Sequence, residues 1–381
     1  MKRQIITNCL LVVLLSVLAM TGDARANTPD WPLWDNYWSY FASTEGRIYD
    51  HDLNDRTTSE AQAYAMFFAL VANDRERFAK LLHWTEQNLA SGDLRHNLPA
   101  WTWGLGTDGK WKVLDYNSAS DADLWIAYSL IQAGHLWNDR NYRSLGQAVA
   151  ERIATEEVAD LPGFGLMLLP GKAGYRHGSI TELNPSYVPL QLLYGLAGEL
   201  PHGPWRGIAS NVPRLIEASS QKGFVMDWVA YDPGKGFTPS NGPRSLPMGA
   251  WDAIRVYLWA GMLDRKSPQR LRTLQAIGGM DYYLHSTAVP PMKVNEHGSI
   301  VDRDGSIGFS AALIPYLLAR GSKHQARIQR KRIEAAFNSA TGLYGNPPRY
   351  YDDDLAIFYF GWAERRFWFS SSGLLKVKWT Q

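Results

Sequence analysis

Apolar residues recur along most of this chain with the period of an α-helix, and residues that favour helix starts precede many of these stretches. The pattern predicts about twelve helices and very little strand. The expected helices cover residues 30–42, 58–72, 75–90, 119–137, 140–157, 185–200, 204–221, 248–264, 267–284, 307–320, 321–339 and 351–366.

Very short links join several of these helices in pairs, for example at 73–74, 138–139 and 320–321, which is typical of helical hairpins. Longer loops rich in Gly, Pro and aromatic residues follow the pairs. These loops cover about 91–118, 158–184, 222–247 and 285–306, with a small β-hairpin expected in 296–304 around Asp302 to Gly305. Six helical hairpins in series predict an all-α ring in which every second helix lines the inside.

The first 26 residues resemble a secretory signal peptide. The basic pair Lys2-Arg3 precedes an apolar run from Cys9 to Met20, and Ala24-Arg25-Ala26 has the A-x-A form of a cleavage site. The run is about a dozen residues long, short of the roughly 20 that a permanent membrane span needs. We therefore expect a signal peptide at 1–26, one domain at 27–381, a periplasmic or secreted location, and no membrane attachment after cleavage.

The composition of the exported part limits the kinds of partner. The single cysteine, Cys9, lies in the removable segment, so no disulfide or thiolate metal site is expected. Loss of that segment leaves 36 basic and 36 acidic residues, and a neutral chain is a poor match for nucleic acid or another polyanion. The chain has 16 Trp and 19 Tyr, rings that suit stacking on sugars, although packing between helices could also use them.

Three carboxylates stand near the starts of predicted inner helices. They are Glu60, Asp121 and Asp252, and the alternation of helices places all three at one end of the ring. Helix capping is the plain alternative, because Thr57-x-x-Glu60 and Ser118-x-x-Asp121 have the form of capping boxes. The acidic run 352–354 before the last helix is also most simply a cap.

Convergence of the three acids favours catalysis over capping. A cap does not need Trp101, Trp103 and Trp111 in the loop just before it. Hydrolysis of a glycosidic bond, in contrast, needs one carboxylic acid to protonate the leaving oxygen and one carboxylate to activate water or attack carbon. Arg255, one turn after Asp252, would keep that residue ionised. The histidines lack zinc-ligand spacing such as i, i+4, so we expect no metal and no cofactor.

One long motif resembles the signature of glycoside hydrolase family 8 throughout: Ala119-Ser120-Asp121-Ala122-Asp123-x-x-Ile126-Ala127-x-Ser129-Leu130-Ile131-x-Ala133-x-x-x-Trp137. Segments 59–66, 98–104, 184–187 and 252–255 look like the family's acid-bearing segment, its aromatic loop and two further blocks. One departure is Ala61, where glycine often follows the acid. The resemblance covers essentially the whole mature chain and implies an (α/α)6 barrel, in agreement with the ring expected from the helices.

The resemblance also implies inversion at the anomeric carbon and a role for each site residue. Glu60 would be the general acid, Asp252 the general base acting through water, and Asp121 would bind the distorted sugar. Some family descriptions label the Asp121 position a nucleophile, but a carboxylate that attacks directly would retain configuration. Tyr187 and Arg255 would place the water and its base. The remaining expected substrate-binding residues are Trp101, Trp103 and Tyr64.

Within the family, the chain is similar to periplasmic endoglucanases encoded with bacterial cellulose synthase. We therefore expect an exported, monomeric, inverting endo-β-1,4-glucanase, a cellulase, with a functional link to a cellulose synthase complex. The alternatives are a non-catalytic glucan-binding protein, a family relative acting on xylan or chitosan, and a lyase acting on uronic acids. Net neutrality and the acidic trio count against the lyase, which would call for a basic groove.

Overall fold

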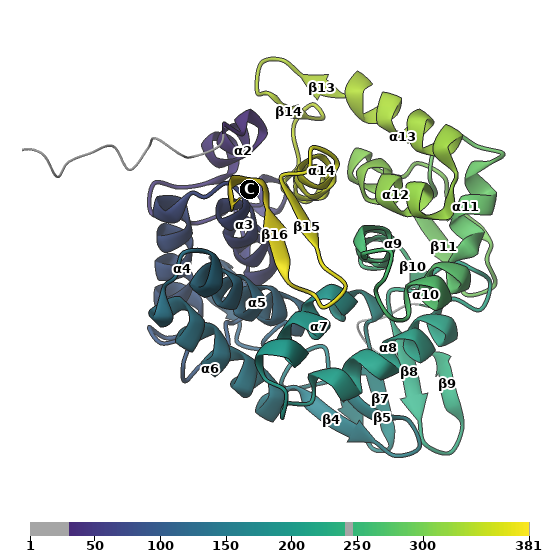
Figure 1. Cartoon of the computed structure of the whole chain (residues 1–381), viewed down its shortest axis with the longest axis horizontal. Helices are drawn as coiled ribbons and strands as arrows, with labels where there is room; N and C mark the ends of the chain where they lie inside the picture. Colours follow the sequence, from purple (N-terminus) through teal and green to yellow (C-terminus); the bar gives the residue numbers. More distant parts are fainter. Residues whose placement is uncertain (1–29, 241–246, 381) are drawn as a thin grey trace, which may run out of the picture.

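Six helices that are apolar on almost every side form the inner ring of the fold (Figure 1). A helix without a polar face is stable only when it is surrounded by other helices. Each inner helix contacts the next one, and the last contacts the first, so the ring closes. The inner helices are α3 (Ser59–Val71), α5 (Ser120–Leu136), α7 (Leu190–Glu199), α9 (Ala253–Met262), α12 (Ile307–Arg320) and α14 (Tyr350–Ala363).

An outer layer of amphipathic helices covers this ring. The computed structural model describes residues 30–240 and 247–380, and the expected signal peptide lies outside them. Each inner helix contacts an outer partner, and α14 contacts the first helix, α2, so the two ends of the ring of hairpins meet. The outer helices are α2 (Pro32–Phe41), α4 (Arg75–Leu89), α6 (Arg140–Glu156), α8 (Trp205–Ser219), α10 (Arg270–Ala276), α11 (Gly278–Leu284) and α13 (Lys323–Ala335). The predicted (α/α)6 barrel is confirmed.

The main difference among the helices concerns the predicted helix 267–284, which is two short helices, α10 and α11. The chain turns at Ile277, and Gly279 lies against the backbone of Gly223, where a Cβ atom would come within 2.8 Å. The predicted helix 185–200 also starts later, because Pro189 disfavours helical backbone in the residue before it. These breaks depend on tertiary contact and proline, which apolar periodicity does not show.

The expectation of very little strand is wrong for the described residues, because segments between the helices and after α14 form six small sheets. The strand pairs provide hydrogen bonds for backbone N–H and C=O groups that lie outside the helices. The hairpin predicted in 296–304 is present but begins earlier, since it pairs residues 293–295 with 300–302, and its turn lies at 296–299 rather than at Asp302 to Gly305. The sheets are β1 (Thr57–Thr58), β2 (Thr102–Leu105), β3 (Trp111–Asp115); β4 (Val158–Leu161), β5 (Gly165–Leu168); β6 (Arg176–His177), β7 (Ile180–Leu183), β8 (Val229–Asp232), β9 (Gly236–Pro239); β10 (Met248–Gly249), β11 (Lys293–Asn295), β12 (Ile300–Asp302); β13 (Phe337–Asn338), β14 (Leu343–Tyr344); and β15 (Phe367–Phe369), β16 (Leu375–Val377).

Aromatic side chains fill the centre of the inner ring. Phe358 on α14 contacts Tyr64, Trp125 and Trp259 from three other inner helices, with ring centroids 5.1 to 5.2 Å apart. Part of the tryptophan and tyrosine excess is therefore packing, as the alternative explanation held. Among the described residues, no helix combines the length and the apolar character of a membrane span.

Candidate active site

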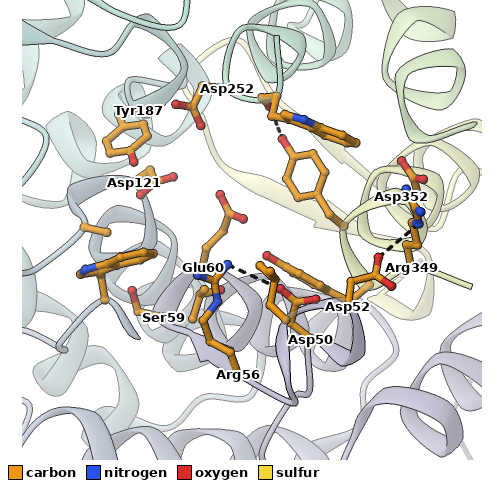
Figure 2. Close-up of a pocket in the computed structure, with 17 residues that line it drawn as sticks. Asp50, Asp52, Arg56, Ser59, Glu60, Asp121, Tyr187, Asp252, Arg349 and Asp352 are labelled. Carbon is orange, nitrogen blue, oxygen red and sulfur yellow. Dashed lines mark hydrogen bonds and ion pairs between the residues drawn. The ribbon is translucent and has the colours of Figure 1, made fainter. Parts of the chain in front are cut away.

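A cleft lies at the end of the ring where inner helices begin (Figure 2). The first residues of α3, α5 and α14 contribute to it, as do residues just before α7 and α9, and its volume is about 420 Å³. Side chains from distant parts of the sequence thus meet at one place. The lining residues are Asp50, Asp52, Leu53, Arg56, Thr58, Ser59, Glu60, Trp101, Ala119, Asp121, Tyr187, Trp251, Asp252, Arg349, Tyr350, Tyr351 and Asp352.

One buried arginine holds the three predicted carboxylates together. Arg255 is 1% exposed, and its Nη1 donates to Glu60 Oε2 and, at 2.9 Å, to Asp121 Oδ2. Its Nη2 donates to Asp252 Oδ1 at 2.7 Å and to Ser186 Oγ at 3.0 Å. The sequence suggested Arg255 as a partner of Asp252 alone. The structure shows that a single guanidinium neutralises part of the charge of all three acids.

The protonation of the acids differs within this cluster. Burial raises the pKa of Asp252 to about 6, against the opposing effect of hydrogen bonds from Asn184 and Trp228. The Asn184 Nδ2 atom donates to Asp252 Oδ2 at 2.9 Å. Burial, together with the charge of Asp252, raises the pKa of Asp121 to about 7. Both acids therefore change protonation state near neutral pH.

The capping explanation of these acids is wrong. Thr58, and not Thr57, caps α3, because its side chain accepts from the Ala61 backbone N–H at 3.1 Å. Asp252 stands at the N-cap position of α9 but makes no capping bond with its side chain. Asp227 takes over that task, since its Oδ1 accepts from the backbone N–H groups of Ala250 and Ala253 at 2.8 and 2.7 Å. The Asp252 side chain therefore bonds to Arg255 and Asn184 and lines the cleft.

The second proposed capping box does not form either. Ser118 Oγ donates to Glu157 Oε1, and α5 begins without a side-chain cap. The acidic run 352–354, predicted to precede the last helix, lies inside α14 and is not a simple cap of that helix. Asp352 accepts from the Gly308 backbone N–H at the start of α12, and Asp353 accepts from the Tyr344 backbone N–H.

Comparisons with known proteins show the family of this chain. The model of the family described as Glycosyl hydrolases family 8 matches residues 3–364. The chain belongs to glycosyl hydrolases family 8. An endoglucanase from Xanthomonas axonopodis pv. citri is 43% identical, over 92% of this chain and 89% of its own, and one from Salmonella typhi is 42% identical, over 92% of each. The crystal structure of an endo-1,4-D-glucanase from Vibrio fischeri ES114 superposes with a TM-score of 0.86 at 38% identity, covering 92% of this chain and all of that one. The protein is a glycoside hydrolase of the endoglucanase type.

The structure places the other predicted residues of this family 8 hydrolase at different depths. Tyr187 lines the cleft, with the Arg255 guanidinium 5.4 Å from its ring centroid, and Trp101 lines it too. Tyr64 lies beneath the cleft rather than in it. It is 1% exposed, and its hydroxyl accepts from Arg255 Nη1 at 3.3 Å.

Trp103, also predicted to bind substrate, is not among the residues that line the cleft, so that role stays a prediction. Its ring stacks on Trp111 at 5.1 Å, and the Arg47 guanidinium lies 4.3 Å from its centroid. The Trp103 side chain of β2 thus packs against β3 through Trp111 and against α4 through Trp84, whose ring centroid lies 5.5 Å away.

Several residues of the cleft were missed from the sequence. Asp52 lies in a short 3-10 helix, His51–Leu53, before α3, and Arg349 directly precedes α14. Trp251 directly precedes Asp252, so its position next to a predicted catalytic acid was the one available signal. Asp52 and Arg349 carried no such signal, since only the closure of the ring brings them together.

A second acidic pair lies behind the cleft. Asp123 and Glu157 are fully buried, and their carboxyl groups influence one another's ionisation. Burial raises the pKa of both, that of Glu157 to about 8, and the charge of Glu157 raises that of Asp123 further. Both carboxyl groups therefore favour the protonated form at neutral pH. Elsewhere in residues 30–240 and 247–380, no cluster of His, Cys, Asp and Glu has the arrangement of a metal site.

Proposed function

We propose that this endoglucanase hydrolyses internal β-1,4 bonds of a glucan such as cellulose and inverts the anomeric carbon. Glu60 is the general acid and Asp252 the general base. The observation that carries the proposal is the sharing of one buried guanidinium by Glu60, Asp121 and Asp252 at the base of a cleft lined by aromatic rings. Two carboxyl groups in different protonation states are what this reaction needs.

Asp252 fits the base. With a pKa of about 6 it is mostly ionised at neutral pH, and Arg255 and Asn184 fix the orientation of its carboxylate. A water molecule gives its proton to Asp252 while its oxygen bonds to the anomeric carbon. The bond from that carbon to the leaving oxygen breaks, and Glu60 protonates that oxygen.

Glu60 and Asp121 complete the reaction scheme. An ion pair with Arg255 favours the charged form of a carboxyl group, so a sugar ring has to separate Glu60 from Arg255 before Glu60 can act as an acid. Asp121 stays 2.9 Å from Arg255 and faces the same cleft, where it can bind the distorted sugar and the positive charge that develops on it. Stacking on Trp101, Tyr187 and Trp251 supports binding of the glucan chain.

We further propose that the protein acts as a monomer in the periplasm, or is secreted, and that it serves bacterial cellulose biosynthesis through a cellulose synthase complex. The A-x-A motif at Ala24-Arg25-Ala26 and the similarity to endoglucanases encoded with such synthases support this. Fractionation of the native host tests the location, and pull-down of a tagged full-length chain tests the link to the synthase.

The central experiment is proton NMR of the first product anomer released from cellopentaose, with reducing ends measured on carboxymethylcellulose. We expect the α-anomer first. Glu60→Gln and Asp252→Asn are expected to lower turnover by about 10²- to 10⁴-fold without loss of fold. Glu334→Gln, which changes an exposed acid on α13, is the matched control and should retain full turnover.

Three outcomes would contradict the proposal. Release of the β-anomer first would show retention instead of inversion. Full turnover in a folded Asp252→Asn variant would remove this residue from the base role. Binding of the glucan by the wild type without any new reducing ends would identify a binding protein in place of an enzyme.

A further inference from the structure

The two ends of the cleft differ. In Figure 2, Tyr187 and Asp121 lie at one end, Asp52 and Arg349 lie at the other, and Glu60 lies between them. The first end presents an aromatic ring to a sugar. The second end presents two opposite charges, which a neutral glucan does not need for recognition.

These two charges form an ion pair at that end of the cleft. Arg349 Nε lies 3.1 Å from Asp52 Oδ2, and both side chains line the cleft. The pair joins the short helix before α3 to the residue that precedes α14. The side chains are 57% and 47% exposed, so water competes with the pair and the cost of separating it is small.

The loop that carries Asp52 is held in place by its own contacts. Asp50 and Arg56 form an antiparallel bridge across its base, and His51 Nδ1 lies 2.6 Å from Asp55 Oδ1. Asp55 and the preceding Asn54 both have a φ of 55°, which non-glycine residues adopt rarely. The fold therefore presents Asp52 to the cleft from a constrained loop.

We propose that the Asp52–Arg349 ion pair is a barrier at one end of the cleft that sets the preference of the enzyme for short over long glucan chains. The proposal rests on the proposed glucan hydrolysis. Cleavage of an internal bond requires the chain to extend past both ends of the cleft. A polymer that continues past Asp52 has to separate the pair, whereas an oligosaccharide that ends before it does not.

The test compares kcat/KM on hydroxyethylcellulose, an uncharged soluble polymer, with kcat/KM on cellotetraose. Arg349→Ala and Asp52→Ala each remove the barrier, so the ratio of polymer to tetraose turnover should rise about two- to fivefold. The charge-swapped double variant Asp52→Arg with Arg349→Asp re-forms the pair and should return the ratio toward that of the wild type. Arg330→Ala, which breaks a comparably exposed pair with Glu334 on α13, is the control and should leave the ratio unchanged.

Salt gives a second readout on the same proteins. Salt weakens exposed ion pairs, because the screening length falls from roughly 30 Å at 0.01 M to roughly 3 Å at 1 M. The ratio of the wild type should therefore rise with NaCl toward that of Arg349→Ala. The ratio of Arg349→Ala itself should respond less.

The outcomes separate this proposal from the proposed function. An active wild type with unchanged ratios in both single variants would overturn the barrier. A lower polymer turnover in both variants would also overturn it, since the pair would then bind the sugar chain instead of obstructing it. A wild type that cleaves neither substrate would overturn the proposed function itself.

Discussion

Asp121 and Asp123 stand two residues apart on α5, yet the protein handles their charges in opposite ways. Residues two positions apart in an α-helix differ in direction by about 200° around the helix axis, so their side chains point to roughly opposite faces. Asp121 faces the cleft and bonds to Arg255, whereas Asp123 is buried on the other face near Glu157. On one face a cation offsets the negative charge, and on the other face burial keeps the carboxyl group protonated.

This difference separates the acids that we propose to be catalytic from the buried pair. A buried carboxyl group without a neighbouring cation ionises only at a high cost in free energy. The acids around Arg255 keep both states within reach near neutral pH, with pKa values of about 6 for Asp252 and about 7 for Asp121. A raised pKa alone therefore does not identify a catalytic acid. A raised pKa in a carboxyl group that lies beside a cation in a cleft is a better indication.

The largest expected effect comes from Arg255→Lys, which keeps the charge but loses the planar fork. A lysine ammonium cannot hold Glu60, Asp121 and Asp252 in the same geometry, so kcat/KM should fall about 10²-fold or more. The general base has to be ionised, so wild-type activity should fall as the pH drops below about 6, the pKa of Asp252. Loss of the contact between Arg255 Nη2 and Asp252 should raise the pKa of Asp252, so the fall in activity should begin at a higher pH. A pH–rate profile measures this shift.

Arg272→Lys is the matched control for this change. Arg272 bonds to Glu217 through two nitrogen atoms, as Arg255 does to its partners, but it lies on the outside of the ring and is 45% exposed. Its replacement should leave the pH–rate profile unchanged. Equal losses in both variants would mean that Arg255 acts through the general stability of the fold and not through the three acids.

Trp101 and Trp103 repeat the contrast on a smaller scale. Trp101→Ala should raise KM about tenfold with unchanged unfolding, because its ring lines the cleft. Trp103→Ala should leave KM unchanged and lower the free energy of unfolding by about 2 kcal/mol, because its ring packs on Arg47 and Trp111. Denaturant unfolding and initial rates measure both effects. A raised KM in Trp103→Ala would instead support the sequence-based role of that residue.

The sequence could predict the ring because its inner helices are apolar all round and its hairpin links are short. It could not predict strands of two to five residues, since their pairing depends on loops that are distant in the chain, as between Thr57 and Trp103. The same limit applies to the site. Glu60, Asp121 and Asp252 stand at helix starts, where their common end follows from the alternation of helices.

Asp227, in contrast, caps a helix 26 residues further along the chain and frees Asp252 from that task. Nothing in the local sequence around Asp227 indicates this role. Trp101 and Trp103 show the same limit, because two tryptophans in one aromatic loop look alike in the sequence, whereas in the structure only Trp101 lines the cleft and Trp103 packs on Trp111.

The smallest expected effect on activity, but a clear effect on stability, comes from Glu157→Gln. The amide can still accept from Ser118, and Asp121 keeps its contact with Arg255, so turnover should change less than about twofold. In the unfolded chain Glu157 ionises near its ordinary pKa of about 4.3, whereas the folded protein holds its proton up to about pH 8. Wild-type stability is therefore lost as the pH rises through this window, and the glutamine variant escapes that loss.

The free energy of unfolding of Glu157→Gln relative to the wild type should thus increase by about 1 to 3 kcal/mol between pH 5 and pH 8. Glu156→Gln, one residue earlier, is the control, because Glu156 is partly exposed and pairs with Arg152 instead of a second acid. A difference between wild type and Glu157→Gln that is the same at both pH values would show that folding does not raise the pKa of Glu157. The contrast between the two faces of α5 would then be one of burial alone.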